Sequence, residues 1–313
     1  MKTLSEEGER NLIKEILKIF NGDIHDDCAV LQHLDGDAVI TTDCISEKAH
    51  IPKGVSWKKV GRFFGAINLS DVAAMGAVPK FFLSGGVLPK NFCKENLIEF
   101  FTGLKEILDE FSVRYVGGDI KEGSAFSFCG VCVGLLPHGK GMFRDRWKEG
   151  DIVGITGNLG KAAAGYILYG EGQDDGSLIL DVNPRVREGI ALREVGVEKC
   201  MDLSDGVYAS ALQLMEINDI GFEFYLNDDI LHPLALKVHK EFKVDKEFLA
   251  FGYGGDYELM FAVAEDEWES LEKKMVERGF PVKKIGKVIK EGLYVVIDGV
   301  RKEARYEGYE HFR

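Results

Sequence analysis

Aspartates beside small or apolar residues recur along this 313-residue chain and could act together. They occur in HDDCAV, TTDC, NLSDVAAMGAVP, VGGD and MDLSDG, either at the ends of strand-like stretches or within a helix-like one. Singly, each could cap a helix or stabilise a turn. Together they favour a shared site made of Asp26, Asp27, Asp43, Asp71, Asp119, Asp202 and Asp205.

Asp71 is the most informative of these carboxylates. It lies in an Ala- and Gly-rich stretch of helical pattern, where an unpaired buried carboxylate would cost several kcal/mol. A cation is therefore the expected partner. Oxygen ligands suit Mg²⁺, which keeps some of its waters and is typically shared between one or two carboxylates and a phosphate. The aspartates together predict several Mg²⁺ ions and a polyphosphate such as ATP.

Further residues bear on phosphate binding. Gly117 and Gly118 would let the backbone approach a phosphate closely. Arg144 could stabilise charge on a phosphoryl group in transfer, although taken alone it is more simply a surface arginine. The stretch GITGNLGKAAAG resembles the phosphate loop GxxxxGK[ST], but it is one residue too long and Ala162 follows its lysine. It therefore predicts a tight turn from a strand into a helix.

Composition and charge narrow the class of protein. Apolar residues make up 45% of the chain and charged residues 29%, as in ordinary soluble globular proteins. A formal charge of −13 disfavours non-specific binding to nucleic acid. The sequence shows neither a secretory signal nor an apolar run of about 20 residues, so we expect a cytoplasmic protein without membrane contact. The six cysteines are scattered, and we expect buried, reduced thiols. Cys129 and Cys132 should point to opposite faces of one strand.

Strand and helix patterns alternate without a repeat, which indicates an α/β class. The apolar spacing predicts helices over residues 12–20, 57–79 and 95–111. Strands are expected in DAVITTDC and FFLSGGVLP, between these helices, and in VRYVGGD and FSFCGVCVGLL after them. The basic, Gly-containing stretch HGKGMFRDRWKEGD marks a boundary, so we expect one domain over residues 1–138 and another over 139–313. The second half should contain strands in DIVGITG, CMDLSDG and YELMFAV, helices in AAAGYILYG, YASALQLMEI and WESLEKKMVERG, and an Asp-Gly hairpin in LYVVIDGVRKEA.

In order and spacing, these motifs resemble the thiamine-monophosphate kinase family, within the superfamily of aminoimidazole-ribonucleotide synthetase. HDDCAV is similar to the family's GDDAAV, and NLSDVAAMGAVP to its NxSDxAAMGAxP. TTD and GGD match directly, MDLSDG matches MDxSDG, and the closing GYEHF resembles G-aromatic-x-H-F. The resemblance runs from the first predicted helix to the C-terminus.

The resemblance implies a two-domain α/β (α+β) fold like that of aminoimidazole-ribonucleotide synthetase. N-terminal sheets would pair across a homodimer, with ATP held near the dimer interface. The implied reaction is direct, in-line transfer of the γ-phosphoryl group of ATP to thiamine monophosphate, which gives thiamine diphosphate.

The resemblance also assigns roles to residues. The implied Mg²⁺ ligands are Asp26, Thr41, Thr42, Asp43, Asp71, Asp119, Asp202 and Asp205. The implied ATP contacts are Gly118, Asp119, Arg144 and Ser204. His50 and Tyr309 would contact thiamine monophosphate, and Arg144 and Asp43 would act in the transfer itself.

Departures from the family pattern concern the acceptor. Gly255 stands where the family has a glutamate that helps to hold the thiamine moiety. Asp256 or Glu258 could replace that glutamate in substrate binding, or could pair only with nearby backbone or cations. His25 replaces a glycine and could touch phosphate or be an exposed turn residue. Two alternatives therefore stay open: an ATP-dependent enzyme of the superfamily with another small-molecule acceptor, and a non-catalytic nucleotide- or metal-binding protein.

Overall fold

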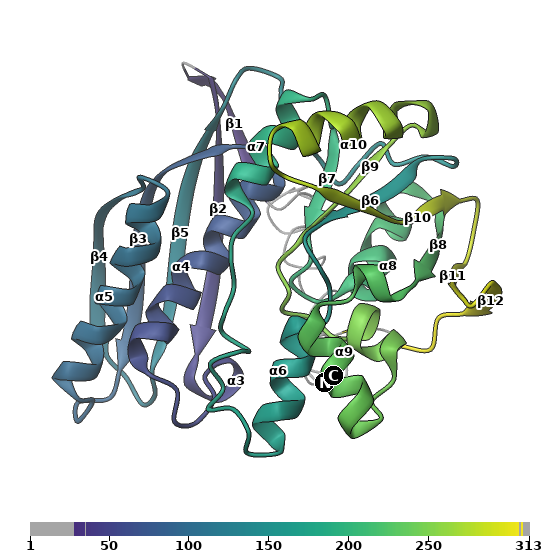
Figure 1. Ribbon diagram of the computed structural model, residues 1–313. Helices are drawn as coiled ribbons and strands as arrows, with labels where there is room; N and C mark the ends of the chain where they lie inside the picture. The colour runs from purple at the N-terminus through teal and green to yellow at the C-terminus, as the bar shows by residue number, and fades with distance from the viewer. Residues whose placement is uncertain (1–27, 35, 307, 309–313) are drawn as a thin grey trace, which may run out of the picture.

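Figure 1 shows the computed structural model, which describes residues 28–34, 36–306 and 308. The first of its sheets has five strands in the order β1-β2-β5-β3-β4. The pair β3-β4 is parallel and the other neighbours are antiparallel. The strands are β1 (Ala29–Leu34), β2 (Gly36–Ser46), β3 (Val78–Leu88), β4 (Arg114–Glu122) and β5 (Ser127–Leu136).

The helices of this half are the short α3 (Glu47–His50) and the long α4 (Trp57–Ala74) and α5 (Lys94–Glu110). Figure 1 shows α4 and α5 running along one face of the five-stranded sheet. Their backbones lie close together at Gly61, where a Cβ would lie only 1.7 Å from the Phe100 carbonyl oxygen, so a glycine is needed there. Buried rings of Phe64, Phe82, Phe100 and Phe128 fill the space between helices and sheet.

The second sheet has seven strands in the order β12-β11-β8-β10-β6-β9-β7. Its strands are β6 (Ile152–Thr156), β7 (Lys199–Asp202), β8 (Gly221–Leu226), β9 (Leu259–Val263), β10 (Val282–Ile289), β11 (Leu293–Ile297) and β12 (Val300–Glu303). The α-helices of this half are α6 (Lys161–Gly170), α7 (Val186–Glu194), α8 (Val207–Asn218), α9 (Pro233–Phe242) and α10 (Trp268–Glu277). A short π-helix, Phe248–Gly252, precedes the loop into β9.

The two halves share a hydrophobic core. Val72 and Ala73 of α4 belong to the same buried cluster as Val186 and Leu192 of α7. The contact is close, since a Cβ on Gly189 of α7 would lie 2.1 Å from the Ala73 carbonyl oxygen. The division between residues 138 and 139 falls in the segment that joins the two sheets, and we keep it as a proposal.

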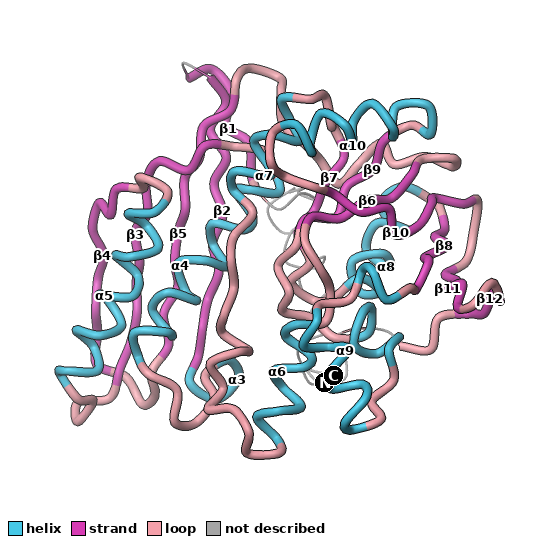
Figure 2. Tube along the Cα trace, viewed as in Figure 1, coloured by secondary structure: helices cyan, strands magenta, loops and turns pink. Residues whose placement is uncertain are grey.

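Most of the predicted elements are confirmed, and Figure 2 shows the alternation of helix and strand. Asp298 and Gly299 form the predicted hairpin turn, with φ values of 51° and 77°. The prediction for residues 12–20 lies outside the described residues. The prediction did not include α3, α7, β8, α9 and β10. No helix within the described ranges is long and apolar enough to cross a membrane.

The expectation of reduced thiols is wrong for one pair of cysteines. Cys44 and Cys129 lie opposite each other on β2 and β5, with Cα atoms 4.1 Å apart, and are joined by a disulfide. Both lie on the exposed face of the sheet, whereas Cys132 is buried, so Cys129 and Cys132 do face opposite sides. The register of β2 against β5 brings the pair together across 85 residues of sequence, which spacing alone does not reveal. Cys28, Cys132 and Cys200 are buried thiols, as expected, whereas the Cys93 thiol is exposed, so the expectation of burial is wrong for Cys93.

Candidate active site

Two of the predicted carboxylates, Asp71 and Asp202, are linked through α4, which lies between the two sheets. On one side, the Thr41 hydroxyl of β2 donates a hydrogen bond to Asp71 of α4. On the other, the Ser70 hydroxyl of α4 donates to Oδ2 of Asp202, at the end of β7, over 2.7 Å. Neighbouring residues of one helix thus bind one strand from each half, so both halves contribute to the site.

The phenol of Tyr257 lies near several of these aspartates. Burial raises the pKa of Tyr257 well above its usual value, and the negative charges of four aspartates raise it further. Those aspartates are Asp43, Asp71, Asp202 and Asp205. The structure therefore places four of the predicted residues near enough to one phenol to raise its pKa.

The oxygen donors of this cluster fit Mg²⁺ shared with a substrate. Among the described residues, no three acidic, histidine or cysteine side chains are grouped closely enough to hold a metal ion by themselves. Mg²⁺ commonly takes only one or two carboxylates and completes its shell with waters and phosphate oxygens. The arrangement fits an ion that is held jointly by protein and phosphate better than a closed metal cage.

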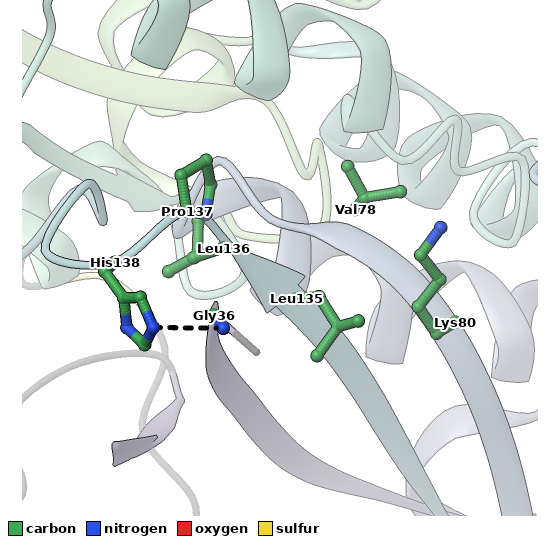
Figure 3. A pocket seen from close by; sticks show the side chains of 7 residues that line it. All are labelled: Gly36, Val78, Lys80, Leu135, Leu136, Pro137 and His138. Carbon is green, nitrogen blue, oxygen red and sulfur yellow. Dashed lines mark hydrogen bonds between the residues drawn. The ribbon is translucent and has the colours of Figure 1, made fainter. Parts of the chain in front are cut away.

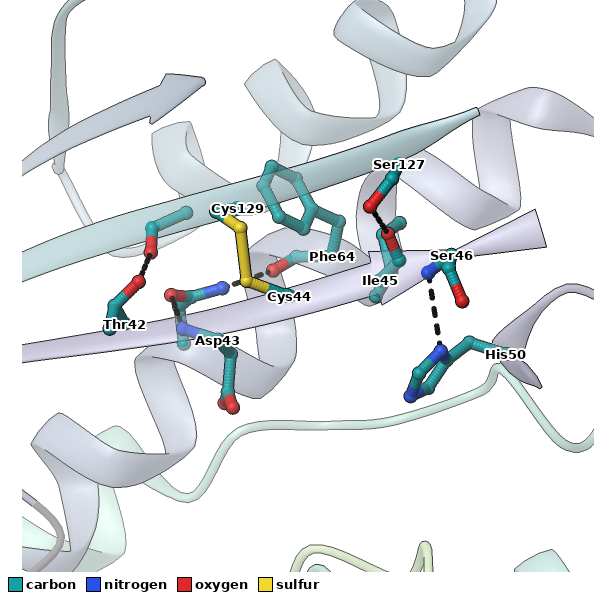
Figure 4. The surroundings of a disulfide bond; sticks show 11 residues. Thr42, Asp43, Cys44, Ile45, Ser46, His50, Phe64, Ser127 and Cys129 are labelled. Carbon is teal, nitrogen blue, oxygen red and sulfur yellow. Dashed lines mark hydrogen bonds between the residues drawn. A yellow bond between two sulfur atoms is a disulfide. The ribbon is translucent and has the colours of Figure 1, made fainter. Parts of the chain in front are cut away.

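The Thr42 side chain lies on the opposite face of β2 from those of Thr41 and Asp43. Side chains alternate along a strand, so Thr41 and Asp43 face α4 while Thr42 is exposed on the opposite face. Its hydroxyl donates to the Gly130 carbonyl oxygen over 2.7 Å. Figure 4 shows Thr42 and Asp43 beside the disulfide.

Asp119 also lies away from the cluster. It belongs to the edge strand β4, three strand spacings from β2, or roughly 14 Å. Gly85 is opposite both Asp119 and Cys129, which puts the Asp119 side chain on the face that carries the disulfide. The carboxylate pairs with Lys121 over 2.7 Å, and this hydrogen bond lowers the pKa of Asp119. Its neighbour Gly118 has no room for a Cβ, which would lie 2.2 Å from the Ser84 carbonyl oxygen.

Arg144 lies in the segment between β5 and β6 and contacts α8, and Ser204 lies in the loop between β7 and α8. The Arg144 guanidinium is 3.2 Å from Oε1 of Gln213 in α8. The Ser204 carbonyl oxygen accepts the Gly255 N–H over 2.7 Å, which joins the MDLSDG loop to the segment before β9. Both residues are partly exposed.

His50 ends the short helix that follows β2. Its Nδ1 accepts the backbone N–H of Ser46 over 3.2 Å, as Figure 4 shows. In the neutral ring this places the proton on Nε2. The Nε2 atom of His50 is then a hydrogen-bond donor. His25, Asp26, Asp27 and Tyr309 lie outside the described residues.

Asp256 caps helix α6. Its carboxylate accepts the N–H of Gly160 over 2.6 Å and that of Ala162 over 2.9 Å. This geometry fits the alternative that Asp256 pairs with nearby backbone. It also confirms the tight turn predicted for GITGNLGKAAAG, since a carboxylate occupies the helix N-terminus that a phosphate loop would offer to its ligand.

Arg185, Thr156 and Tyr257 were missed by the sequence interpretation. Glu258 accepts hydrogen bonds from Thr156 Oγ1 and Arg185 Nε, each over 2.6 Å, and is almost fully buried. The acidic DYEL stretch was a usable signal for Glu258 and Tyr257. Arg185 and Thr156 are distant in sequence, so only the fold reveals that they are partners.

A separate pocket lies at the other end of the first sheet, lined by Gly36, Val78, Lys80, Leu135, Leu136, Pro137 and His138 (Figure 3). Gly36 precedes Asp43 by seven residues of one strand, which corresponds to roughly 23 Å. None of the predicted site residues lines this pocket. It is therefore distinct from the carboxylate cluster.

Comparison with known proteins covers nearly the whole chain. The models of AIR synthase related protein match residues 25–136 with the N-terminal domain and residues 148–299 with the C-terminal domain. The thiamine-monophosphate kinase of Methanospirillum hungatei is 32% identical over 97% of this chain and 99% of its own length. That of Escherichia coli K12 is 31% identical, over 92% and 91%.

Solved structures of the same family also resemble this chain over nearly its whole length. AaThiL complexed with AMPPCP and TMP superposes with a TM-score of 0.87 at 27% identity, covering 99% of both chains. Thiamine-monophosphate kinase from Stenotrophomonas maltophilia gives a TM-score of 0.75 at 26% identity, over 94% of this chain and 96% of that one. The hydrogenase maturation protein HypE of Escherichia coli, at 20% identity and a TM-score of 0.72, shares the fold.

Proposed function

The chain belongs to the thiamine-monophosphate kinase family, and we infer that it transfers the γ-phosphoryl group of ATP to thiamine monophosphate, yielding thiamine diphosphate. The observation that carries this inference is the likeness, over 99% of both chains, to a structure that holds AMPPCP and TMP. The convergence of four aspartates on α4 and the adjoining strands supplies the matching chemistry.

We propose that Asp43, Asp71, Asp202 and Asp205 hold Mg²⁺ jointly with the phosphates of the reactants. When bound, the ions neutralise phosphate charge and favour in-line transfer. The protein fixes the carboxylates beforehand, because Thr41 orients Asp71 and Ser70 orients Asp202. Asp26, Thr42 and Asp119 remain proposed ligands, although Thr42 and Asp119 would have to act from the opposite face of the sheet.

Substrate contacts follow from the same proposal. His50 would donate from Nε2 to the phosphate of thiamine monophosphate. Gly118, Asp119, Arg144 and Ser204 would contact ATP, and Arg144 would stabilise charge on the group in transfer. Tyr309 would contact the thiamine moiety.

We also propose a homodimer formed through the uncovered face of the five-stranded sheet. Phe81, Leu83 and Val87 of β3 alternate on this face and are each 37–38% exposed. Apolar side chains gathered on one exposed face are typical of an interaction surface. Asp119 lies on this face too, so pairing would bring it beside the second copy.

An assay with γ-labelled ATP and Mg²⁺ tests the proposed function, with thiamine monophosphate, thiamine and aminoimidazole-pathway nucleotides offered as acceptors. We expect label in thiamine diphosphate alone. Label in another acceptor would assign a different reaction of the superfamily. ATP binding without transfer to any acceptor would indicate a non-catalytic protein.

A further inference from the structure

Tyr257, in the loop that leads into β9, adopts a strained backbone conformation. Its φ is +51°, in the left-handed region that bulky residues seldom occupy. Its N–H donates to the Leu203 carbonyl oxygen over 3.1 Å, so the backbone is tied to the loop between Asp202 and Asp205. Its ring meets that of Phe63 in α4 edge to face, with centroids 6.2 Å apart.

The residues on both sides of Tyr257 hold it in this conformation. Asp256 is fixed by two backbone N–H groups at the start of α6. Glu258 is fixed by Arg185 and Thr156, and its carbonyl oxygen accepts the Leu203 N–H over 2.9 Å. Strained residues persist where their surroundings over-determine them, and they gather at functional sites.

The Tyr257 hydroxyl lies among charges but has no hydrogen-bond partner within the described part of the chain. The four aspartates that act on it come from both halves of the molecule, Asp43 and Asp71 from one and Asp202 and Asp205 from the other. A phenol is neutral at physiological pH, so its O–H can donate. The contact with Phe63 explains why an aromatic ring is present at this position, but it does not involve the hydroxyl.

We propose that the Tyr257 hydroxyl donates a hydrogen bond to a phosphate oxygen of the reactants at the aspartate cluster. The proposal rests on the proposed function and deepens it, because it adds a neutral donor to the cluster of four aspartates. Phosphate oxygens are strong acceptors, and a donor among carboxylates can contact them where Mg²⁺ joins protein to phosphate.

The test compares Tyr257→Phe with Tyr225→Phe in the full chain. The first variant keeps the ring that packs on Phe63 and removes only the hydroxyl. The second removes a hydroxyl on β8, four strand spacings or roughly 19 Å from β7 and its Asp202. Calorimetry measures the affinity of each variant for AMPPCP with Mg²⁺ and for thiamine monophosphate with Mg²⁺. Initial rates give kcat/KM.

For Tyr257→Phe we expect the affinity for one of the two ligands to fall about 10-fold and kcat/KM to fall about 10- to 100-fold. The ligand whose affinity falls identifies the phosphate concerned. Tyr225→Phe should match the wild-type protein. Affinities and rates of Tyr257→Phe within about threefold of wild type would overturn the proposal. If the wild-type protein does not phosphorylate thiamine monophosphate, the proposed function fails, but the two affinity measurements still decide whether the Tyr257 hydroxyl contacts a phosphate.

Discussion

Asp202 is only 2% exposed, and its carboxylate accepts the Ser70 hydroxyl, so this charge is fixed before any reactant binds. Asp202→Asn keeps an oxygen for Ser70 but removes the negative charge. We expect turnover to fall by about 100-fold or more, because a proposed Mg²⁺ ligand is lost. The melting temperature should not fall, because repulsion among the aspartates is relieved. Initial rates across a Mg²⁺ titration and a thermal melt measure both effects.

The matched control for this prediction is Asp219→Asn. Asp219 is exposed beyond the end of α8 and has φ +53°, which asparagine also tolerates. It should leave the rate unchanged. An Asp202→Asn variant with wild-type turnover and Mg²⁺ dependence would remove Asp202 from the metal site.

The backbone conformation at position 255 explains why a glycine stands there in place of the family's glutamate. Its φ is +96°, and an added Cβ would lie 3.1 Å from the Cβ of Ala162. Introducing the glutamate of the family by Gly255→Glu should therefore lower the free energy of unfolding by about 1–2 kcal/mol, without lowering the KM for thiamine monophosphate. Urea denaturation and initial rates test this prediction.

Gly150→Glu is the control that distinguishes backbone strain from crowding as the cause of the lower free energy of unfolding. Gly150 has φ +90° but no atom within 4 Å of an added Cβ, so it reports backbone strain without crowding. A Gly255→Glu protein that is fully stable and binds thiamine monophosphate more tightly would show that the glycine is a lost substrate contact.

Single residues of the site were predictable where a motif surrounds them. Asp43, Asp71, Asp202 and Asp205 were named from short motifs, and the structure brings them together. Thr42 was named with them, but the alternation of side chains along β2 places it on the other face. Tyr257 was missed because its left-handed conformation depends on tertiary contacts.

At the scale of elements, α4 positions the site because it packs closely against α5 and reaches both sheets. Gly61→Ala should lower the free energy of unfolding by about 1–3 kcal/mol, since the Cβ would overlap the Phe100 carbonyl oxygen and force the helices apart. Gly170→Ala, at the end of α6 with no atom within 4 Å, is the control and should be neutral or slightly stabilising. Urea denaturation compares the two. Equal stability of both variants would refute the close packing of α4 on α5.

The elements themselves were largely predictable, because α4, α5 and the strands of the first sheet have clear apolar periodicity. β10 was harder, because VKKIGKVI carries lysines and an internal glycine. Gly286 is explained only by the fold, since a Cβ there would lie 2.5 Å from the Glu223 carbonyl oxygen of β8. The disulfide likewise depends on the register of β2 against β5, which the local sequence does not specify.

At the scale of the whole molecule, the uncovered face of the first sheet predicts a dimer in solution. Sedimentation equilibrium should give twice the mass of the chain, and Leu83→Glu should shift the protein towards monomer by placing a charge in the apolar face. Val276→Glu is the control, because Val276 is 56% exposed on α10, outside that face. A wild-type monomer, or a Leu83→Glu protein that stays dimeric, would contradict this interface.

Carboxylates from both halves of the molecule are proposed to hold metal ions against the reacting phosphates. Anomalous diffraction from crystals grown with Mn²⁺, AMPPCP and thiamine monophosphate tests this proposal most directly. We predict Mn²⁺ peaks within about 2.0–2.3 Å of carboxylate oxygens of Asp43 or Asp71 and of Asp202 or Asp205, each shared with a phosphate oxygen. Nucleotide bound without metal at these aspartates, or metal held by only one half of the molecule, would contradict the account.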